Sequence, residues 1–146
     1  MRVYLDVCCM NRPFDNQSED RMRLEAEAIL TIIARVQDGR YTLIKGDILD
    51  LEISKIPDAE RKKKVGLFAN LATSAIHVDS MIIKRAKEII KLGLKGFDAI
   101  HIACAENGKV DVFLTTDDEI IKKYTKNMQD FKVKIRNPLS WLAEVV

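Results

Sequence analysis

Residues 96–118, GFDAIHIACAENGKVDVFLTTDD, carry the pattern that decides the fold class. Apolar residues recur at helical spacing after Asp98, which stands where a helix N-cap belongs, and Asn107-Gly108 predicts a left-handed end to that helix. Residues 110–114 then show the pattern of a buried strand, which ends in Thr115, Thr116, Asp117 and Asp118. Open α/β sheets place their sites where a strand ends before a helix. The stretch therefore predicts that Asp98 and Asp117 lie at one edge of a sheet.

The whole chain has the composition of an ordinary globular domain. Its 146 residues are 47% hydrophobic and 32% charged, which predicts one domain over residues 1–146 with room for a hydrophobic core. A net charge of +2 is too small to indicate nucleic-acid binding by itself. No apolar run approaches the ~20 residues that cross a bilayer, and the N-terminus lacks a signal-peptide pattern. The three cysteines suit free thiols in a reducing cytoplasm.

Predicted strands and helices alternate along the chain. The strands are predicted over residues 3–5, 41–44, 75–78, 110–114 and 131–135, the last with alternating lysines that suit a sheet edge. Pro13 and its Asn and Asp neighbours predict a loop after the first strand. Helices are predicted from Ser18 or Asp20 to Gln37, from Asp47 to before Pro57, from Pro57 through Leu71, from the cap Ser80 to Gly93, from Asp98 to Asn107, from Glu119 to Lys126, and from Pro138 onward. The pattern predicts an α/β fold, a three-layer α/β/α domain with a parallel sheet and right-handed crossovers.

Four acids from distant parts of the chain are predicted to meet at one edge of this sheet. Asp6 ends the first strand, Glu52 lies in the helix after the second, and Asp98 and Asp117 flank the fourth. Clustered carboxylates repel one another, and a bound Mg²⁺ or Mn²⁺ removes that penalty. Such a cation activates water and offsets charge on a phosphoryl group, so metal-assisted phosphodiester hydrolysis is the expected chemistry. Singly, Asp98 fits a helix cap, Glu52 a solvated helix residue, and Asp117 or Asp118 a cap for the next helix.

The same residues resemble the PIN-domain nucleases. The resemblance rests on Asp6 after VYL, Glu52 in GDILDLEISK, Asp98 in GFDAIHIACA and Asp117 in VFLTTDDE. It implies a five-stranded parallel sheet between helices, and Mg²⁺ or Mn²⁺ bound by these four acids as catalytic residues. Many such proteins are ribonucleases, notably the VapC-type toxins. It also implies that Thr115 or Thr116 is the hydroxyl residue beside the last acid, and it leaves open whether Asp117 or Asp118 is the fourth acid.

Further candidate residues lie near the predicted site or share its helices and strands. Cys8 stands where the family often has a polar residue. Arg12 and Asn11 are the expected contacts to substrate RNA, because their loop leaves the same edge as Asp6. His101 lies one turn after Asp98, where a packed core histidine is favoured over a catalytic base, and His77 is taken as structural.

The leading functional hypothesis is a Mg²⁺- or Mn²⁺-dependent endoribonuclease in the cytoplasm. It would act on RNA as the toxin of a toxin–antitoxin pair, with an antitoxin protein as its partner. A homodimer that does not associate with a membrane is expected. The alternative is a PIN-fold module that binds RNA or protein with little turnover, for which Cys8 leaves room. A phosphoacceptor receiver domain is disfavoured, because that class has an acidic pair near the start of the chain and Asp6 stands alone.

Overall fold

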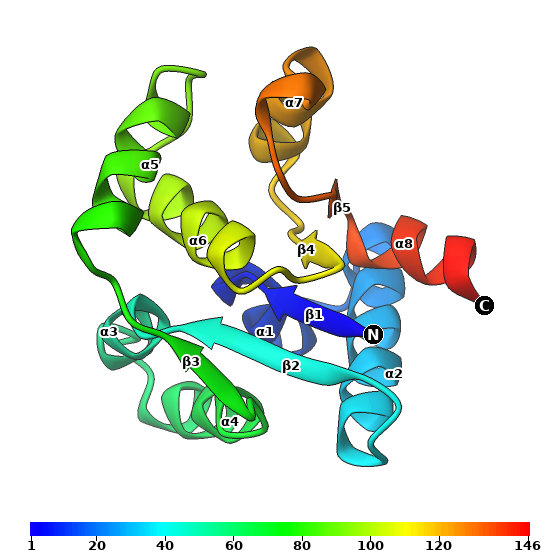
Figure 1. Cartoon of the computed structure of the whole chain (residues 1–146). Helices are drawn as coiled ribbons and strands as arrows, with labels where there is room; N and C mark the ends of the chain where they lie inside the picture. Colours follow the sequence, from blue (N-terminus) through cyan, green and yellow to red (C-terminus); the bar gives the residue numbers. More distant parts are fainter.

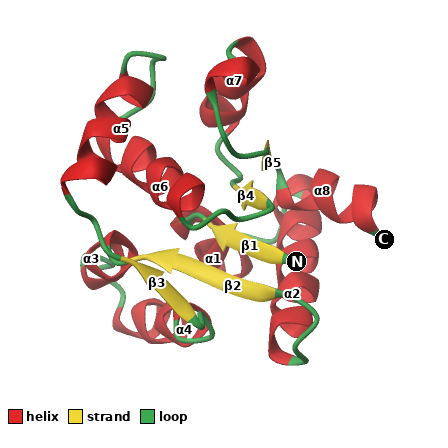
Figure 2. Cartoon of the chain, viewed as in Figure 1, coloured by secondary structure: helices red, strands yellow, loops and turns green.

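The computed structural model describes residues 1–146, and Figures 1 and 2 show helices on both sides of a central sheet. The strands are β1 (Arg2–Leu5), β2 (Thr42–Gly46), β3 (Ser74–Ile76), β4 (Val112–Leu114) and β5 (Ile135–Arg136). The helices are α1 (Val7–Asn11), α2 (Asp20–Gln37), α3 (Ile48–Ser54), α4 (Ala59–Ala69), α5 (Ser80–Ile90), α6 (Gly96–Asn107), α7 (Asp118–Lys126) and α8 (Pro138–Val145). Two 3₁₀ turns cover Arg12–Phe14 and Met128–Asp130. None of the helices is long and apolar enough to cross a membrane.

The sheet is parallel throughout and has the order β3-β2-β1-β4-β5. The chain runs from β1 outward to β2 and β3, then returns to pair β4 with the other side of β1. The strand order therefore reverses between β1 and β4. In open α/β sheets, the crevice beyond the carboxyl ends of the strands at such a reversal is where ligands bind.

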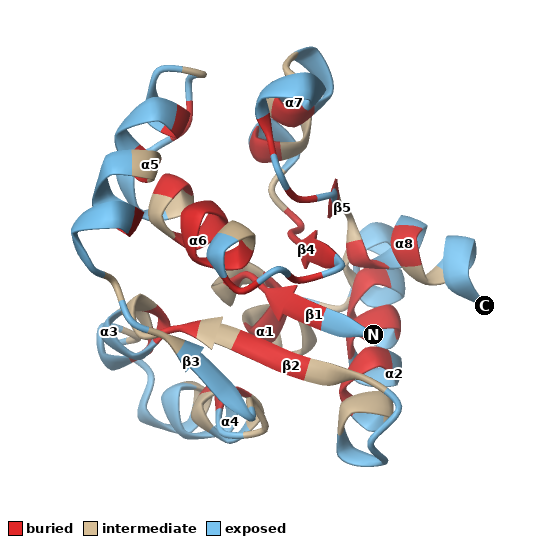
Figure 3. Ribbon diagram, in the orientation of Figure 1, coloured by how far each residue is buried: buried red, intermediate tan, exposed pale blue.

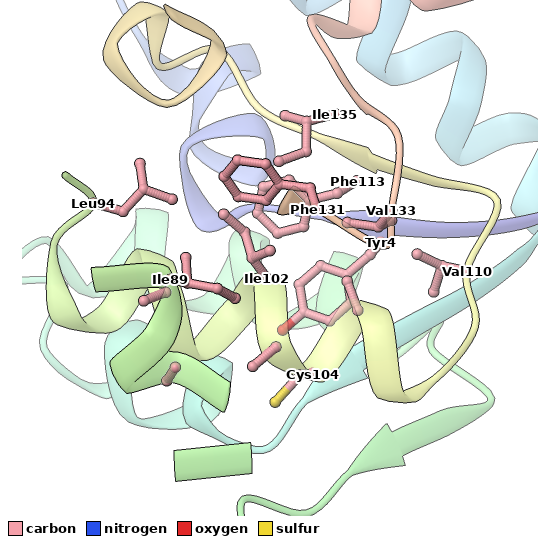
Figure 4. Packing of buried hydrophobic residues seen from close by; sticks show 14 of the residues in the cluster. Tyr4, Ile89, Leu94, Ile102, Cys104, Val110, Phe113, Phe131, Val133 and Ile135 are labelled. Atoms are coloured by element: carbon pink, nitrogen blue, oxygen red, sulfur yellow. The ribbon is translucent and has the colours of Figure 1, made fainter. Parts of the chain in front are cut away.

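Successive side chains of the strands pack into two separate hydrophobic cores, one on each face of the sheet. Val3 and Leu5 of β1 pack against α2, α3, α4 and α8, whereas Tyr4 points to the opposite face and packs with α5, α6 and α7. Figure 4 shows Tyr4, Ile102 and Phe113 in this second core, and Figure 3 shows buried residues concentrated in β1, β4 and α6. The predicted three-layer α/β/α fold with a five-stranded parallel sheet is confirmed.

The segment after β1 differs from its prediction. In place of a loop, the chain forms α1 and then the 3₁₀ turn Arg12–Phe14. The carboxylate of Asp6 caps α1 by accepting a hydrogen bond from the Val7 backbone N–H. Pro13 lies in the first turn of the 3₁₀ segment, where a missing N–H costs little. Turn-forming residues thus follow a helix that the cap residue Asp6 starts.

Several predicted helix ends are also corrected. Helix α6 begins at Gly96 with Lys95 at its N-cap, so Asp98 lies inside the first turn and is not the cap. Asp79 caps α5, not Ser80. After α6 the left-handed residue is Lys109 (φ 51°), because Gly108 keeps a right-handed conformation.

The last two strands are shorter than predicted. Strand β4 starts only at Val112, because the Asp111 carboxylate accepts the Arg2 backbone N–H (2.6 Å) at the entrance to the sheet. Strand β5 is confined to Ile135–Arg136, and Phe131 and Val133 before it pack into the core. As predicted, the segment forms the edge of the sheet.

Candidate active site

Two of the predicted acids lie where the strand order reverses. Asp6 directly follows β1 and Asp117 lies just beyond β4, and these two strands pair in parallel. Asp6 is only 4% exposed. Its Oδ1 accepts the Val7 backbone N–H (2.8 Å), and its Oδ2 accepts the hydroxyl of Thr115 (3.0 Å). These bonds fix the carboxylate at the carboxyl end of the central strand.

Thr115 connects the two acids. Besides donating to Asp6, its Oγ1 accepts the backbone N–H of Asp117 (3.1 Å). The Asp117 carboxylate in turn accepts the Glu119 backbone N–H (2.9 Å) and caps α7. Thr116 is also buried, but its backbone N–H contacts the Cys8 sulfur at 3.4 Å. Of the two threonines, Thr115 therefore has its hydroxyl between the acids.

Asp98 is half-buried in the first turn of α6, and neighbouring acids act on it. Burial raises the pKa of Asp98, and the negative charges of Asp117 and Glu52 raise it further. Burial likewise raises the pKa of Asp6 well above its ordinary value, and Asp98 adds to this shift. Because Asp98 is not the helix cap, its carboxylate makes no hydrogen bond within the protein.

Glu52 joins the acids from α3, and a buried histidine holds it. Nε2 of His101 is hydrogen-bonded to Oε1 of Glu52, and Nδ1 of the same ring lies 2.5 Å from the Tyr4 hydroxyl. Tyr4 and His101 are both fully buried. The packed histidine expected from the sequence is therefore present, but its link to Glu52 was missed. Its position one turn after Asp98 was the available signal.

The acids at this edge lack basic partners. No Lys or Arg pairs with Asp6, Asp98 or Asp117, whereas the adjacent Asp118 forms an ion pair with Arg21 at 2.6 Å. Carboxylates that raise one another's pKa without a basic partner suit a divalent cation, which takes oxygen ligands and supplies the missing charge. No three His, Cys, Asp or Glu side chains are already arranged to hold an ion. A cation would therefore have to draw these carboxylates together.

The two residues expected to contact RNA are engaged within the protein. Arg12 forms ion pairs with Asp15 and with the buried Glu25, both at 3.2 Å. The Asn11 side chain donates to the Val7 carbonyl oxygen (3.0 Å) and lies near Arg61. Both side chains thus hold the segment after β1 against its neighbours.

Comparisons with known proteins agree with the fold. The sequence matches the PIN domain family over residues 3–126. The fold is similar to a chain in the crystal structure of VapBC2 from Rickettsia felis bound to a DNA fragment from their promoter. The TM-score is 0.55 at 15% identity, and the match covers 94% of this chain and 98% of the other. No match was found among curated proteins. This chain belongs to the PIN domain family, whose members are generally nucleases.

Proposed function

We propose that this protein is a Mg²⁺- or Mn²⁺-dependent endoribonuclease that hydrolyses RNA phosphodiester bonds. The observation that carries the proposal is the set of carboxylates without basic partners, Asp6, Asp98 and Asp117, where the strand order of a PIN domain reverses. Glu52 completes the set from α3. Asp6, Glu52, Asp98 and Asp117 would hold the cation, which supplies positive charge that offsets the charge of a phosphoryl group.

The chain itself prepares this site through fixed carboxylates. Thr115 and the Val7 backbone N–H hold Asp6, and the first turn of α7 holds Asp117. Asp98 has no hydrogen-bonding partner that competes with a ligand. Asp6 and Asp117 are thus held before the substrate arrives and need little reorganisation, whereas the cation would have to draw Asp98 and Glu52 toward them.

Exposed residues beside the acids offer contacts for single-stranded RNA. Phe97 precedes Asp98 and is 41% exposed, and the Lys55 ammonium lies 5.4 Å from the centre of its ring. Lys95, at the N-cap of α6, is also exposed. Aromatic rings stack on unpaired bases and lysines bind phosphates, so Phe97, Lys55 and Lys95 form our proposed RNA-contact group.

We further propose that the protein acts in the cytoplasm as the toxin of a toxin–antitoxin pair. The similar chain from Rickettsia felis was solved as VapBC2, and the same division of roles would give this chain a separate antitoxin protein as its partner. We also propose a homodimer, which light scattering at micromolar concentration would test. A monomeric mass would contradict it.

An RNA cleavage assay across a Mn²⁺ titration tests the nuclease proposal. Wild-type protein should cleave RNA only with Mg²⁺ or Mn²⁺, and Asp98→Asn should abolish cleavage while the protein stays folded. Asp118→Asn is the matched control, because Asp118 carries the same charge nearby but is paired with Arg21. Cleavage by Asp98→Asn at the wild-type rate would reject the assignment. A wild-type protein that binds RNA without cutting it would favour the alternative binding module.

A further inference from the structure

A chain of buried polar groups runs beneath the carboxylates. The Gly46 backbone N–H donates to the Tyr4 hydroxyl oxygen (2.9 Å), which lies 2.5 Å from Nδ1 of His101. Nε2 of His101 meets Oε1 of Glu52. Because Tyr4 and His101 are 0% exposed, neither reaches a substrate. This series of hydrogen bonds ends at Glu52, the one acid of the proposed site that lies on α3.

Counting the available protons identifies the donor and the acceptor in each of these hydrogen bonds. A backbone N–H only donates, so the Tyr4 oxygen is the acceptor of the Gly46 bond. The hydroxyl has one proton, and His101 is its sole remaining hydrogen-bonding partner. Donation from Tyr4 to an unprotonated Nδ1 is the arrangement that gives this buried hydroxyl proton an acceptor. A neutral ring that accepts at Nδ1 carries its proton on Nε2, and that proton points to Glu52.

Gly46 is needed for this approach. A Cβ atom at this position would lie 2.7 Å from the Tyr4 hydroxyl oxygen and 3.0 Å from the Cys104 sulfur. Any other residue would push the end of β2 away from Tyr4 and break the first bond of the chain. The network thus joins β1, β2, α3 and α6 through hydrogen bonds.

We propose that His101 is a positioning residue, which holds Glu52 toward the cation through a proton fixed on Nε2 by Tyr4 and Gly46. The inference rests on the proposed function, since Glu52 is one of the acids assigned to the cation. His101 occupies Oε1 of Glu52, and Oε2 makes no hydrogen bond within the protein, so it remains free to bind an ion. Groups that orient a ligand in this way commonly control metal affinity.

The first test reads the tautomer without any activity measurement. Long-range ¹H–¹⁵N correlation spectra of ¹⁵N-labelled protein distinguish a ring protonated at Nε2 from one protonated at Nδ1. The chain has only two histidines, so His77→Asn assigns the His101 signals. We expect the His101 ring to carry a proton on Nε2, the nitrogen that faces Glu52, in metal-free protein. A ring protonated only on Nδ1, which has no proton to donate to Glu52, would overturn the inference.

The second test measures Mn²⁺ binding from the electron paramagnetic resonance signal of the free ion. His101→Leu should weaken binding about 10–100-fold, the range for residues that orient a metal ligand. His101→Gln should recover most of the affinity, because its amide N–H₂ lies near the position of Nε2–H. Thermal melts establish that each variant is folded. Tyr4→Phe, which removes only a hydroxyl, should weaken binding a few-fold and serves if His101→Leu does not fold.

The outcomes separate this inference from the proposed function. Wild-type Mn²⁺ affinity in both His101→Leu and Tyr4→Phe, with weakened binding in Glu52→Gln, would overturn the positioning role and leave the cation site in place. A wild-type protein that binds no Mn²⁺ would overturn both. Weakened binding in His101→Leu with recovery in His101→Gln supports positioning, because a merely structural loss would not return with the amide.

Discussion

Arg21 on α2 holds the carboxylate of Asp118 through two guanidinium hydrogen bonds of 2.8 and 2.6 Å. This ion pair distinguishes Asp118 from the adjacent Asp117, whose roles could not be told apart from the sequence. The hydrogen bonds from Arg21 lower the pKa of Asp118, so the carboxylate stays charged and engaged. Asp117 has no basic partner and instead raises the pKa of Asp98. The different surroundings favour Asp117 as the fourth acid of the proposed cation site.

Replacing Asp117 and Asp118 by asparagine, one at a time, tests this distinction. Asp117→Asn should remove cleavage and weaken Mn²⁺ binding, whereas Asp118→Asn should leave both near wild type. Both side chains of the Arg21–Asp118 pair are more than half exposed, so losing it should cost less than about 1 kcal/mol of stability. Cleavage assays and thermal melts of the two variants provide the measurement. Lost cleavage in Asp118→Asn alone would reverse the assignment.

The raised pKa of Asp98 predicts a pH-dependent difference in stability. Folding disfavours its charged form, so the destabilisation is present above the raised folded-state pKa and disappears as the pH falls through it. Metal-free Asp98→Asn should therefore melt higher than wild type at neutral pH, and the difference should shrink on acidification. About 2–4 °C corresponds to each kcal/mol in a domain of this size.

Asp118→Asn is the control for this pH series and has the opposite sign. Because Arg21 lowers the pKa of Asp118, its contribution to stability is present at neutral pH and is lost in acid. Mn²⁺ should raise the melting temperature of wild type and of Asp118→Asn but not of Asp98→Asn. A melting temperature of Asp98→Asn that tracks wild type at every pH would show that the carboxylate carries no such repulsion.

The sequence predicted the architecture because its signals are local and repeated. The alternation in Val3-Tyr4-Leu5 reflects a strand whose neighbouring side chains enter opposite cores. The positions of Asp6 and Asp117 followed from the rule that parallel strands end at one edge. The resemblance to PIN domains implied a five-stranded parallel sheet, whereas the order of its strands comes from the structure.

Interactions between distant residues were beyond the reach of sequence patterns. Asp6 caps α1 while it ends β1, and a single residue with both roles hides the start of a short helix. Arg12 was expected to contact RNA. Its partner Glu25 lies on α2, and the burial of Glu25 becomes apparent only from the folded structure. The link between His101 and Glu52 likewise joins residues 49 positions apart. Such contacts depend on the packing of helices, which periodicity does not specify.

The buried Glu25 predicts a stability role for Arg12. Glu25 is 1% exposed and contacts Arg12 and Arg21 at 3.2 Å, and it accepts a hydrogen bond from Asn137 (2.5 Å). Glu25→Ala should cost about 1–3 kcal/mol, because its buried contacts are lost while Arg12 keeps Asp15 and Arg21 keeps Asp118 as partners. Arg12→Ala should cost about 1–3 kcal/mol, since Arg21 and Asn137 remain for Glu25. Urea unfolding measures both, and an Arg12→Ala variant with unchanged stability but raised KM for RNA would instead indicate a substrate contact.

Phe97 gives the sharpest test of how RNA is held. A base stacked on an aromatic ring contributes about 1–3 kcal/mol, so Phe97→Ala should weaken RNA binding by about 5–150-fold. Phe97→Trp should keep or improve affinity, because any flat aromatic ring can stack. Leu30→Ala is the control, since Leu30 is an equally exposed apolar residue on α2 and should have no effect. Binding to a single-stranded RNA in the inactive Asp98→Asn background separates affinity from cleavage. If proteins with Phe97 and with Phe97→Ala, both in the Asp98→Asn background, bound the RNA with equal affinity, the RNA would lie on another surface.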